Sequence, residues 1–253
     1  MSKPLQKMKP DAMAPEEWEA RLELAAMYRL FDFLGWTEMI YNHITVRVPG
    51  PERTYLINPF GLNYDEVTAR NLVKVNLAGE AVDGSTHMVN KAGFVIHSAI
   101  HAGRPDVQCV LHTHTPDGVA VSAQEHGLLP ISQQATIALS SIGYHDYEGI
   151  AVNDAEKPRL VNDLGRNANF ILRNHGLLTV GPSVADACLV MFHLQRACEI
   201  QVRALSSKVK EVDPRIVAGV KANVAMVTKG MGGQIAWPAL LRKLGRVNPG
   251  HES

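Results

Sequence analysis

Three histidines carry the chemistry that this sequence indicates most strongly. His112 and His114 stand two residues apart in the apolar stretch 107–114. If that stretch is a strand, both imidazoles lie on one face and can reach one ion at about 2.0–2.1 Å. His175 precedes Gly176, where a flexible backbone can turn the side chain back over the sheet. Three neutral imidazoles that leave one position open are a catalytic pattern of zinc coordination, so these residues predict a divalent metal site.

The spacing of these histidines also fits a second interpretation. His112 and His114 can form a polar strand edge, and His175 can be a hydrogen-bonded turn residue, because histidine is common in turns. Spacing alone therefore leaves the metal site and the structural role open. If the site is real, zinc is the first expectation, and manganese or iron can also bind histidine nitrogens.

The elements that must position these side chains alternate between helical and strand patterns. Apolar residues recur at three- and four-residue steps after Pro15, which predicts a helix up to about residue 33. Period-two alternation at 43–48 places His43, Thr45 and Arg47 on one face of a half-buried strand. Other helices are expected at 91–102 and, after a cap at Ser183, up to about residue 205. Further strands are expected at 54–58, 72–77, 107–114, 170–173 and 177–180.

This mixture of elements predicts an α/β fold, a three-layer αβα sandwich with a central mixed or antiparallel sheet. Residues 1–14 are polar and contain proline, and we expect a flexible N-terminal arm. Residues 15–207 form the predicted domain. Residues 208–253 form a C-terminal extension that is expected to pack on the domain or on a neighbouring subunit.

Composition excludes several classes of function. The 253 residues hold 25 Lys+Arg and 25 Asp+Glu, so no net positive charge favours binding to nucleic acid or to a membrane surface. The N-terminus lacks the apolar core of a signal peptide, which predicts a cytoplasmic protein. Cys109, Cys188 and Cys198 are scattered and contain no CxxC pair, so three free, buried thiols are expected.

Nine short stretches of the sequence carry a resemblance to a known family. They are NHITVR (42–47), NPFG (58–61), NKAGF (90–94), HSAIH (97–101), RPD (104–106), HTHT (112–115), YHDYEG (144–149), RNHG (173–176) and CEIQV (198–202). Through them the sequence resembles the class II aldolase and adducin family over about residues 18–207, and several look more like the head domain of adducins than like sugar-phosphate aldolases. The resemblance implies an αβα sandwich that assembles as a homotetramer, with His112, His114 and His175 as ligands of a divalent metal.

Departures from the aldolase pattern change the functional expectation. Gly93 stands where the resemblance implies a glutamate acid/base, and Gln134 stands near the place of a tyrosine proton donor. The phosphate-binding hydroxyl residues are replaced by Phe60, Lys91 and Ala92, and only Gly61 of that pocket remains. Aldol chemistry needs a base within hydrogen-bond reach, so sugar-phosphate cleavage by the familiar route is not expected.

Other residues can supply protons or bind substrate. His97 and His101 lie four residues apart on one helix face, a spacing that fits either two metal ligands or two satisfied core histidines. His97, Tyr144 and Glu148 are our candidate catalytic residues, although a subunit contact explains the 144–148 cluster equally well. Asn42, Gly61 and Lys91 are our candidate substrate-binding residues, the first at a pocket mouth and the last facing a carboxylate. Alternatively, Asn42 belongs to a polar strand face, and the Lys91 side chain is solvated and binds no substrate.

Two hypotheses of function follow. The first is a divalent-metal-dependent lyase that acts on a small carbonyl or carboxylate compound by aldol cleavage or decarboxylation, through an enolate-forming step. A non-haem iron oxygenase on the same fold is a variant of it. The second is a non-catalytic oligomerisation or scaffold module like the adducin head, with binding of the actin cytoskeleton type.

Overall fold

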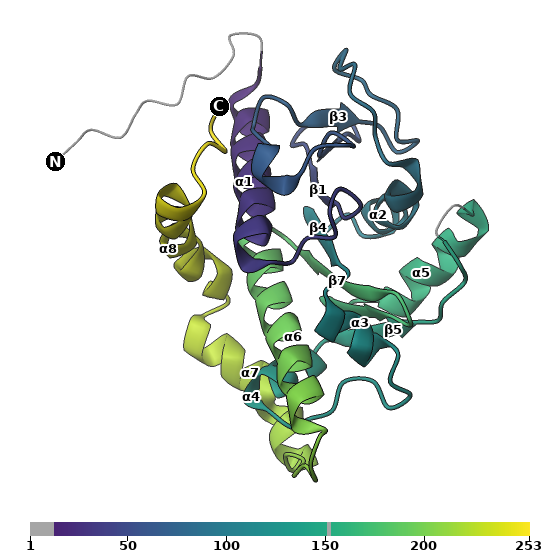
Figure 1. Ribbon diagram of the computed structural model, residues 1–253, viewed down its shortest axis with the longest axis vertical. Coiled ribbons are helices and arrows are strands. Elements are labelled where there is room, and N and C mark those ends of the chain that lie inside the picture. The colour runs from purple at the N-terminus through teal and green to yellow at the C-terminus, as the bar shows by residue number, and fades with distance from the viewer. Residues whose placement is uncertain (1–12, 151–152) are drawn as a thin grey trace, which may run out of the picture.

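A seven-stranded sheet in the order β3-β2-β1-β4-β7-β6-β5 forms the centre of the computed structural model (Figure 1). The structure describes residues 13–150 and 153–253, apart from the side chains of residues 91 and 92. Neighbouring strands run antiparallel, except that β5 and β6 are parallel. The strands are β1 (Ile44–Arg47), β2 (Tyr55–Ile57), β3 (Val73–Val75), β4 (Cys109–Thr113), β5 (Ile142–His145), β6 (Asn169–Leu172) and β7 (Gly176–Gly181).

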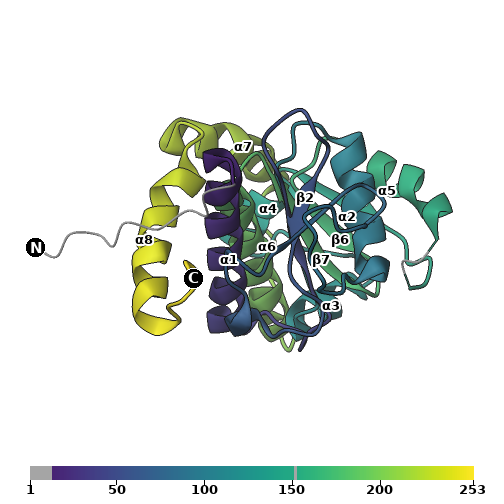
Figure 2. The ribbon, with the colours of Figure 1, turned by 90° about the horizontal axis from the view of Figure 1, so that it is seen from above.

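Helices cover both faces of the sheet, which confirms the predicted αβα sandwich (Figure 2). One face is covered by α1 (Pro15–Leu34), α3 (Pro116–Ser122), α4 (Gln133–Leu139) and α6 (Val184–Ala204). The other face is covered by α2 (Lys91–Gly103) and α5 (Lys157–Leu164). Two short 3-10 helices, η1 (Tyr64–Glu66) and η2 (Asp154–Glu156), lie in the connections.

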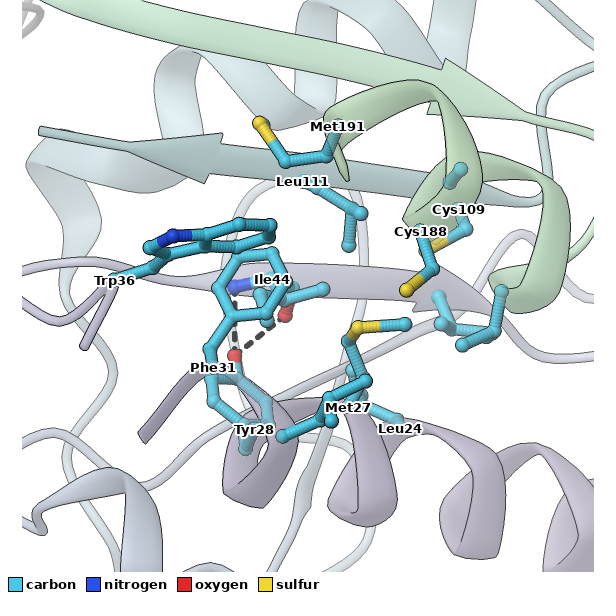
Figure 3. Close-up of a cluster of buried hydrophobic side chains, with 14 of the residues drawn as sticks. Leu24, Met27, Tyr28, Phe31, Trp36, Ile44, Cys109, Leu111, Cys188 and Met191 are labelled. Carbon is cyan, nitrogen blue, oxygen red and sulfur yellow. Dashed lines mark hydrogen bonds between the residues drawn. The ribbon is translucent and has the colours of Figure 1, made fainter. Parts of the chain in front are cut away.

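Helix α1 packs on the sheet and forms hydrogen bonds to the start of strand β1. Pro15 occupies its first turn, and Gly35 ends it in the left-handed conformation at φ 70°. Its buried face includes Tyr28 and Phe31, which pack with side chains of β4 and α6 (Figure 3). The Tyr28 hydroxyl donates to the Ile44 carbonyl at 2.6 Å and accepts from the Ile44 amide at 2.7 Å. These bonds fix the backbone beside His43, the residue that precedes β1.

Strand alternation divides the interior into two main cores. On β4, Cys109 and Leu111 face α1 and α6, whereas Val110 belongs to the cluster beneath α2 and α5. His112 is two residues beyond Val110, so its side chain also leaves the sheet on the α2 side. The His112 side chain therefore lies on the face of the sheet that α2 and α5 cover.

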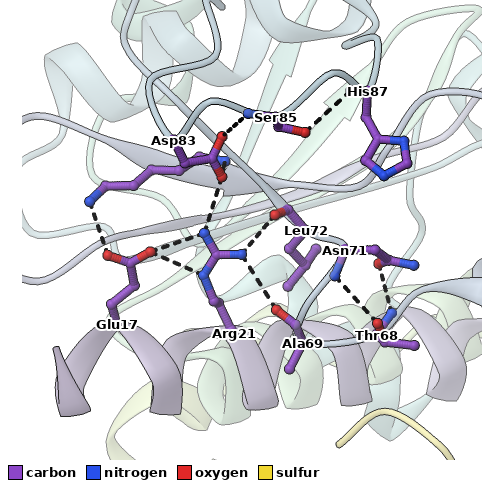
Figure 4. A network of polar contacts seen from close by, with 10 residues as sticks. Glu17, Arg21, Thr68, Ala69, Asn71, Leu72, Asp83, Ser85 and His87 are labelled. Carbon is purple, nitrogen blue, oxygen red and sulfur yellow. Dashed lines mark hydrogen bonds and ion pairs between the residues drawn. The ribbon is translucent and has the colours of Figure 1, made fainter. Parts of the chain in front are cut away.

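Arg21 ties α1 to the loops that flank β3 (Figure 4). Its guanidinium donates to Glu17 at 3.0 Å, to the Leu72 carbonyl at 2.7 Å and to Asp83 at 3.3 Å. The Arg21 side chain is 3% exposed. A charge at this depth is tolerated because several acceptors surround it.

The residues after 207 form α7 (Pro214–Thr228) and α8 (Gly232–Val247). Helix α8 contacts α1 and α6 of the same chain and buries Trp237 and Leu244. Beyond it, Arg29 donates to the Pro249 carbonyl at 2.7 Å. The expected arm at 1–14 lies almost entirely outside the described residues. No helix in the described part of the chain is long and apolar enough to cross a membrane.

Candidate metal centre and its cavity

The three predicted histidines meet where β4 ends and the β6–β7 turn returns. The Nε2 atom of His114 lies 2.7 Å from that of His112 and 3.0 Å from that of His175. The Nε2 atoms of His112 and His175 are 3.2 Å apart. Among the described residues, these three form the one group of histidine, cysteine or acidic side chains whose geometry suits a metal ion.

The turn that carries His175 is not made by Gly176, contrary to the expectation from the sequence. The left-handed residue is Asn174, at φ 56°, two positions before Gly176. Gly176 begins β7, where a Cβ atom would overlap the main-chain carbonyl oxygen of Thr113. The glycine is thus needed for close strand approach, and the asparagine makes the turn.

Burial and a main-chain contact set the state of these imidazoles. His112 Nδ1 lies 2.8 Å from the Leu177 carbonyl oxygen, which can only accept, so the ring proton sits on Nδ1. Nε2 of His112 is then a lone-pair donor that faces the other two rings. Burial lowers the pKa of all three histidines, that of His175 to about 4, and the neighbouring imidazoles lower those of His112 and His175 further. All three are neutral at neutral pH.

The donor set fits a divalent cation. Mutual hydrogen bonds cannot satisfy all three ring nitrogens, because each offers either one proton or one lone pair, and a bond between two of them leaves the third without a partner. Two nitrogens bound at 2.0–2.1 Å to one tetrahedral zinc ion are about 3.3 Å apart, close to the observed 2.7–3.2 Å. His112, His114 and His175 would hold the ion and leave its remaining coordination toward the cavity.

A cavity of about 380 Å³ opens beside these nitrogens. Besides the three histidines, its described lining is largely aromatic or aliphatic and includes no lysine or arginine. The remaining lining residues are Tyr41, His43, Phe60, Asn90, Gly93, Ile96, Tyr147, Gly149 and Ile150.

His43 lies against Gly93 in the wall of this cavity. A Cβ atom at position 93 would overlap the His43 ring, at 1.9 Å from its Cε1 atom and 2.5 Å from each of its nitrogens. Desolvation by burial lowers the pKa of His43 to about 4, and the main-chain groups of Gly93 and Tyr41 offset this only in part. The His43 imidazole, which is neutral, therefore fills the space beside Gly93 where the family resemblance implies a glutamate side chain.

His97 lies behind His43 and does not line the cavity. It is fully buried, and its ring centroid is 4.3 Å from that of His43. Thr45 Oγ1 lies 2.8 Å from both His97 Nδ1 and His101 Nε2. His97 and His101 lie outside the metal-binding group, and burial lowers the pKa of His101 to about 3.

The structure does not bring Tyr144 or Glu148 into the cavity. Tyr144 packs against the core on the α1 side of the sheet, and its hydroxyl accepts from the Leu128 amide at 3.1 Å. Glu148 pairs with Arg159 through bonds of 2.6 and 2.5 Å. The aromatic residue of this segment that lines the cavity is Tyr147, whose ring centroid is 6.3 Å from that of His175.

The candidate substrate-binding residues have different positions. Asn42 is 1% exposed and donates to the Trp36 carbonyl at 3.5 Å, so it lies in the interior beside His43. Gly61 follows the lining residue Phe60 and has a φ of 107°. Lys91 begins α2, and its side chain lies outside the part of the structure that is described.

Comparison with known proteins assigns the family. The sequence model of the Class II Aldolase and Adducin N-terminal domain matches residues 22–202. The chain belongs to this family. The resemblance read from the sequence motifs is thereby confirmed.

Members and relatives of the class II aldolase and adducin family match the chain at several levels. The crystal structure of an aldolase II superfamily protein from Pseudomonas syringae is 48% identical, with a TM-score of 0.91 over 96% of this chain and 98% of that one. L-fuculose 1-phosphate aldolase from Glaciozyma antarctica is 27% identical, with a TM-score of 0.81 over 96% and 97%. Alpha-adducin of Rattus norvegicus is 54% identical over 202 residues, which are 78% of this chain and 27% of the adducin.

Proposed function

We propose that this family member is a divalent-metal-dependent lyase that cleaves or decarboxylates a small carbonyl or carboxylate compound. The observation that carries the proposal is the meeting of three imidazole nitrogens, 2.7–3.2 Å apart, at the wall of a cavity. Zinc is the expected ion, because three neutral imidazoles with an open position suit it. When bound, the ion supplies a Lewis acid that polarises a carbonyl group.

The chain's own residues prepare the site. The Leu177 carbonyl fixes the tautomer of His112, and burial keeps all three ligands neutral, so no proton has to leave before metal binding at neutral pH. Tyr147 and Ile96 place apolar surface around the open side and limit the water that reaches the substrate.

The lining favours an unphosphorylated substrate. Phe60 stands where the family resemblance implies a phosphate-binding hydroxyl residue, and its side chain lines the cavity. Phe60 and Tyr41 contribute aromatic surface instead, which suits a substrate with an apolar part. This supports an oxo or hydroxy acid in place of a sugar phosphate.

The similarity to alpha-adducin supports a second candidate, a non-catalytic scaffold that uses the fold for oligomerisation. A ferrous oxygenase is a third possibility, since the same nitrogens accept iron. For either enzyme we propose a cytoplasmic location and a homotetrameric assembly. Light scattering on the purified protein tests the tetramer.

Metal analysis of the purified protein tests the proposal. We expect about one equivalent of zinc, manganese or iron per chain, and a rise in melting temperature of the chelator-treated protein when that ion is restored. Proton NMR then follows loss of a panel of unphosphorylated oxo and hydroxy acids. A protein that takes up none of the three ions would support the scaffold, and oxygen consumption with ferrous ion would support the oxygenase.

A further inference from the structure

His43 is a buried polar residue whose ring nitrogens lie near main-chain groups of Gly93 and Tyr41 but form no well-aligned hydrogen bond with the described residues. It is 4% exposed, and it lines the cavity. Neither ring nitrogen has a hydrogen-bond partner of good geometry among the described residues. A buried polar group without a partner is unfavourable, and because His43 lines a cavity, a ligand bound there can supply the missing bond.

The surroundings of His43 hold its ring in place. The His97 ring packs against it, with centroids 4.3 Å apart. Thr45 fixes His97 in turn through a contact of 2.8 Å. Gly93, four residues before His97 on α2, leaves the space that the ring occupies. A polar group held in this way meets a ligand without first losing side-chain freedom.

The position of His43 relative to the metal cluster suits contact with the same small molecule. Its ring centroid is 6.1 Å from that of His112, and both rings line one cavity. A neutral imidazole offers one N–H donor and one lone pair, so it can bond a carbonyl, hydroxyl or carboxylate oxygen. Asn90 offers the same two functions from α2's N-terminal end.

We propose that His43 is a substrate-binding residue that hydrogen-bonds to an oxygen of an unphosphorylated oxo or hydroxy acid, and that glycine at position 93 is required to leave room for this ring. The inference rests on the proposed function, because substrate and metal ligands must share the cavity. It goes beyond that function by assigning the recognition of the substrate oxygen to one residue. It also couples two positions that are fifty residues apart in the sequence.

Cobalt-substituted protein separates metal binding from ligand recognition. Visible absorption of Co(II) reports its uptake, and a second spectral change reports binding of acetohydroxamate or benzohydroxamate, the two oxygen-bearing probes. We expect His43→Ala and His43→Asn to bind Co(II) within threefold of the wild type. We expect His43→Ala to bind both probes at least about tenfold more weakly, the loss of one good hydrogen bond in a cavity. His87→Ala, at an exposed histidine, is the matched control.

The outcomes of this experiment separate the two proposals. If His43→Ala and His43→Asn hold Co(II) and bind both probes within twofold of the wild type, the role of His43 is refuted and the lyase proposal stands. If the wild-type protein takes up no Co(II), the lyase proposal fails, and the role of His43 fails with it.

A metal-free experiment tests the shared space directly. Gly93→Ala should lower the melting temperature by about 5 °C or more, because the new methyl group overlaps the His43 ring. The same substitution in a His43→Ala background should cause little or no loss. Gly219→Ala is the matched control, since that helical glycine has only Asn223 near its added methyl group, at 3.9 Å. Equal losses from Gly93→Ala in both backgrounds would contradict the coupling.

Discussion

The Nδ1 atom of His112 lies 2.8 Å from the main-chain carbonyl oxygen of Leu177, across the ladder that joins β4 to β7. This bond orients the ring and selects the tautomer that presents Nε2 to the other two histidines. Because the acceptor is a main-chain atom, the sheet itself holds the His112 ring in place. The candidate metal site is therefore anchored to β4 and β7, two interior strands of the sheet.

Loss of one histidine of the cluster should abolish tight metal binding. We expect His112→Ala and His175→Ala to weaken zinc affinity by at least about 100-fold, measured by competition with a chromophoric chelator. His87→Ala removes an exposed histidine and should leave the affinity unchanged. Retention of wild-type affinity by either cluster variant would show that the ion binds elsewhere.

Thr45 should stabilise the protein through its contacts with two histidines. Replacement by the isosteric valine leaves His97 Nδ1 and His101 Nε2 without this partner, so we expect a loss of about 2 kcal/mol in the free energy of unfolding. Thr54→Val is the control, because the buried Thr54 hydroxyl has no hydrogen-bond partner in the part of the chain that the structure describes. Urea unfolding should show Thr54→Val to be neutral or stabilising. Equal effects of the two substitutions would contradict this role of Thr45.

Periodicity predicted several parts of the fold that extend over many repeats, but it did not predict the 15-residue helix α7. The long helices α1 and α6 and the shared face of His112 and His114 follow from spacing alone. The seven-residue helices α3 and α4 were not predicted, because two turns provide too few repeats to separate from a loop.

The site was predictable only where its residue types were distinctive. His43 lies on the predicted polar face of its strand, but its position beside the cluster depends on Gly93, which only the folded chain brings near. The sequence led us to choose Tyr144 as the candidate catalytic tyrosine of its segment, and Tyr147 was not chosen. Tyr144 belongs to β5 and points to the α1 side, whereas Tyr147 follows the end of that strand and reaches the cavity.

Arg21 should be among the polar residues most important for stability. Arg21→Ala removes the buried cation that Glu17 and Asp83 share, although Lys74 still pairs with Glu17, and we expect a loss of about 3 kcal/mol in the free energy of unfolding. Arg215→Ala removes an exposed arginine paired with Asp213 and should leave stability unchanged within error. Urea denaturation compares the two. A small effect of Arg21→Ala would mean that water replaces the guanidinium.

The three cysteines should be unreactive in the folded protein. Cys109, Cys188 and Cys198 are free and buried. Burial raises the pKa of Cys188 and Cys198 to about 12, so little thiolate forms at pH 8. A chromogenic disulfide reagent should titrate no thiol in native protein and three in denaturant. Rapid reaction of the native protein would contradict this burial.

Acid should destabilise the metal-free protein in a defined pH range. The pKa values of His43 and His175 are lowered to about 4 and that of His101 to about 3, whereas unfolded histidine titrates near 6.5. Below pH 6.5 the unfolded chain binds protons that the folded chain does not. Stability is therefore greatest above pH 6.5 and falls as the pH drops toward 4, by about 1.4 kcal/mol per pH unit for each proton taken up.

Urea unfolding at several pH values between 7.5 and 5 measures this slope. His43→Asn should reduce the slope by about one proton, because one buried neutral imidazole is gone. His87→Asn, at the surface, should leave the slope unchanged. A slope that stays flat down to pH 5 would mean that the folded protein accepts protons on these rings. In that case, the neutral state on which both metal binding and the role of His43 depend would not hold below pH 6.5.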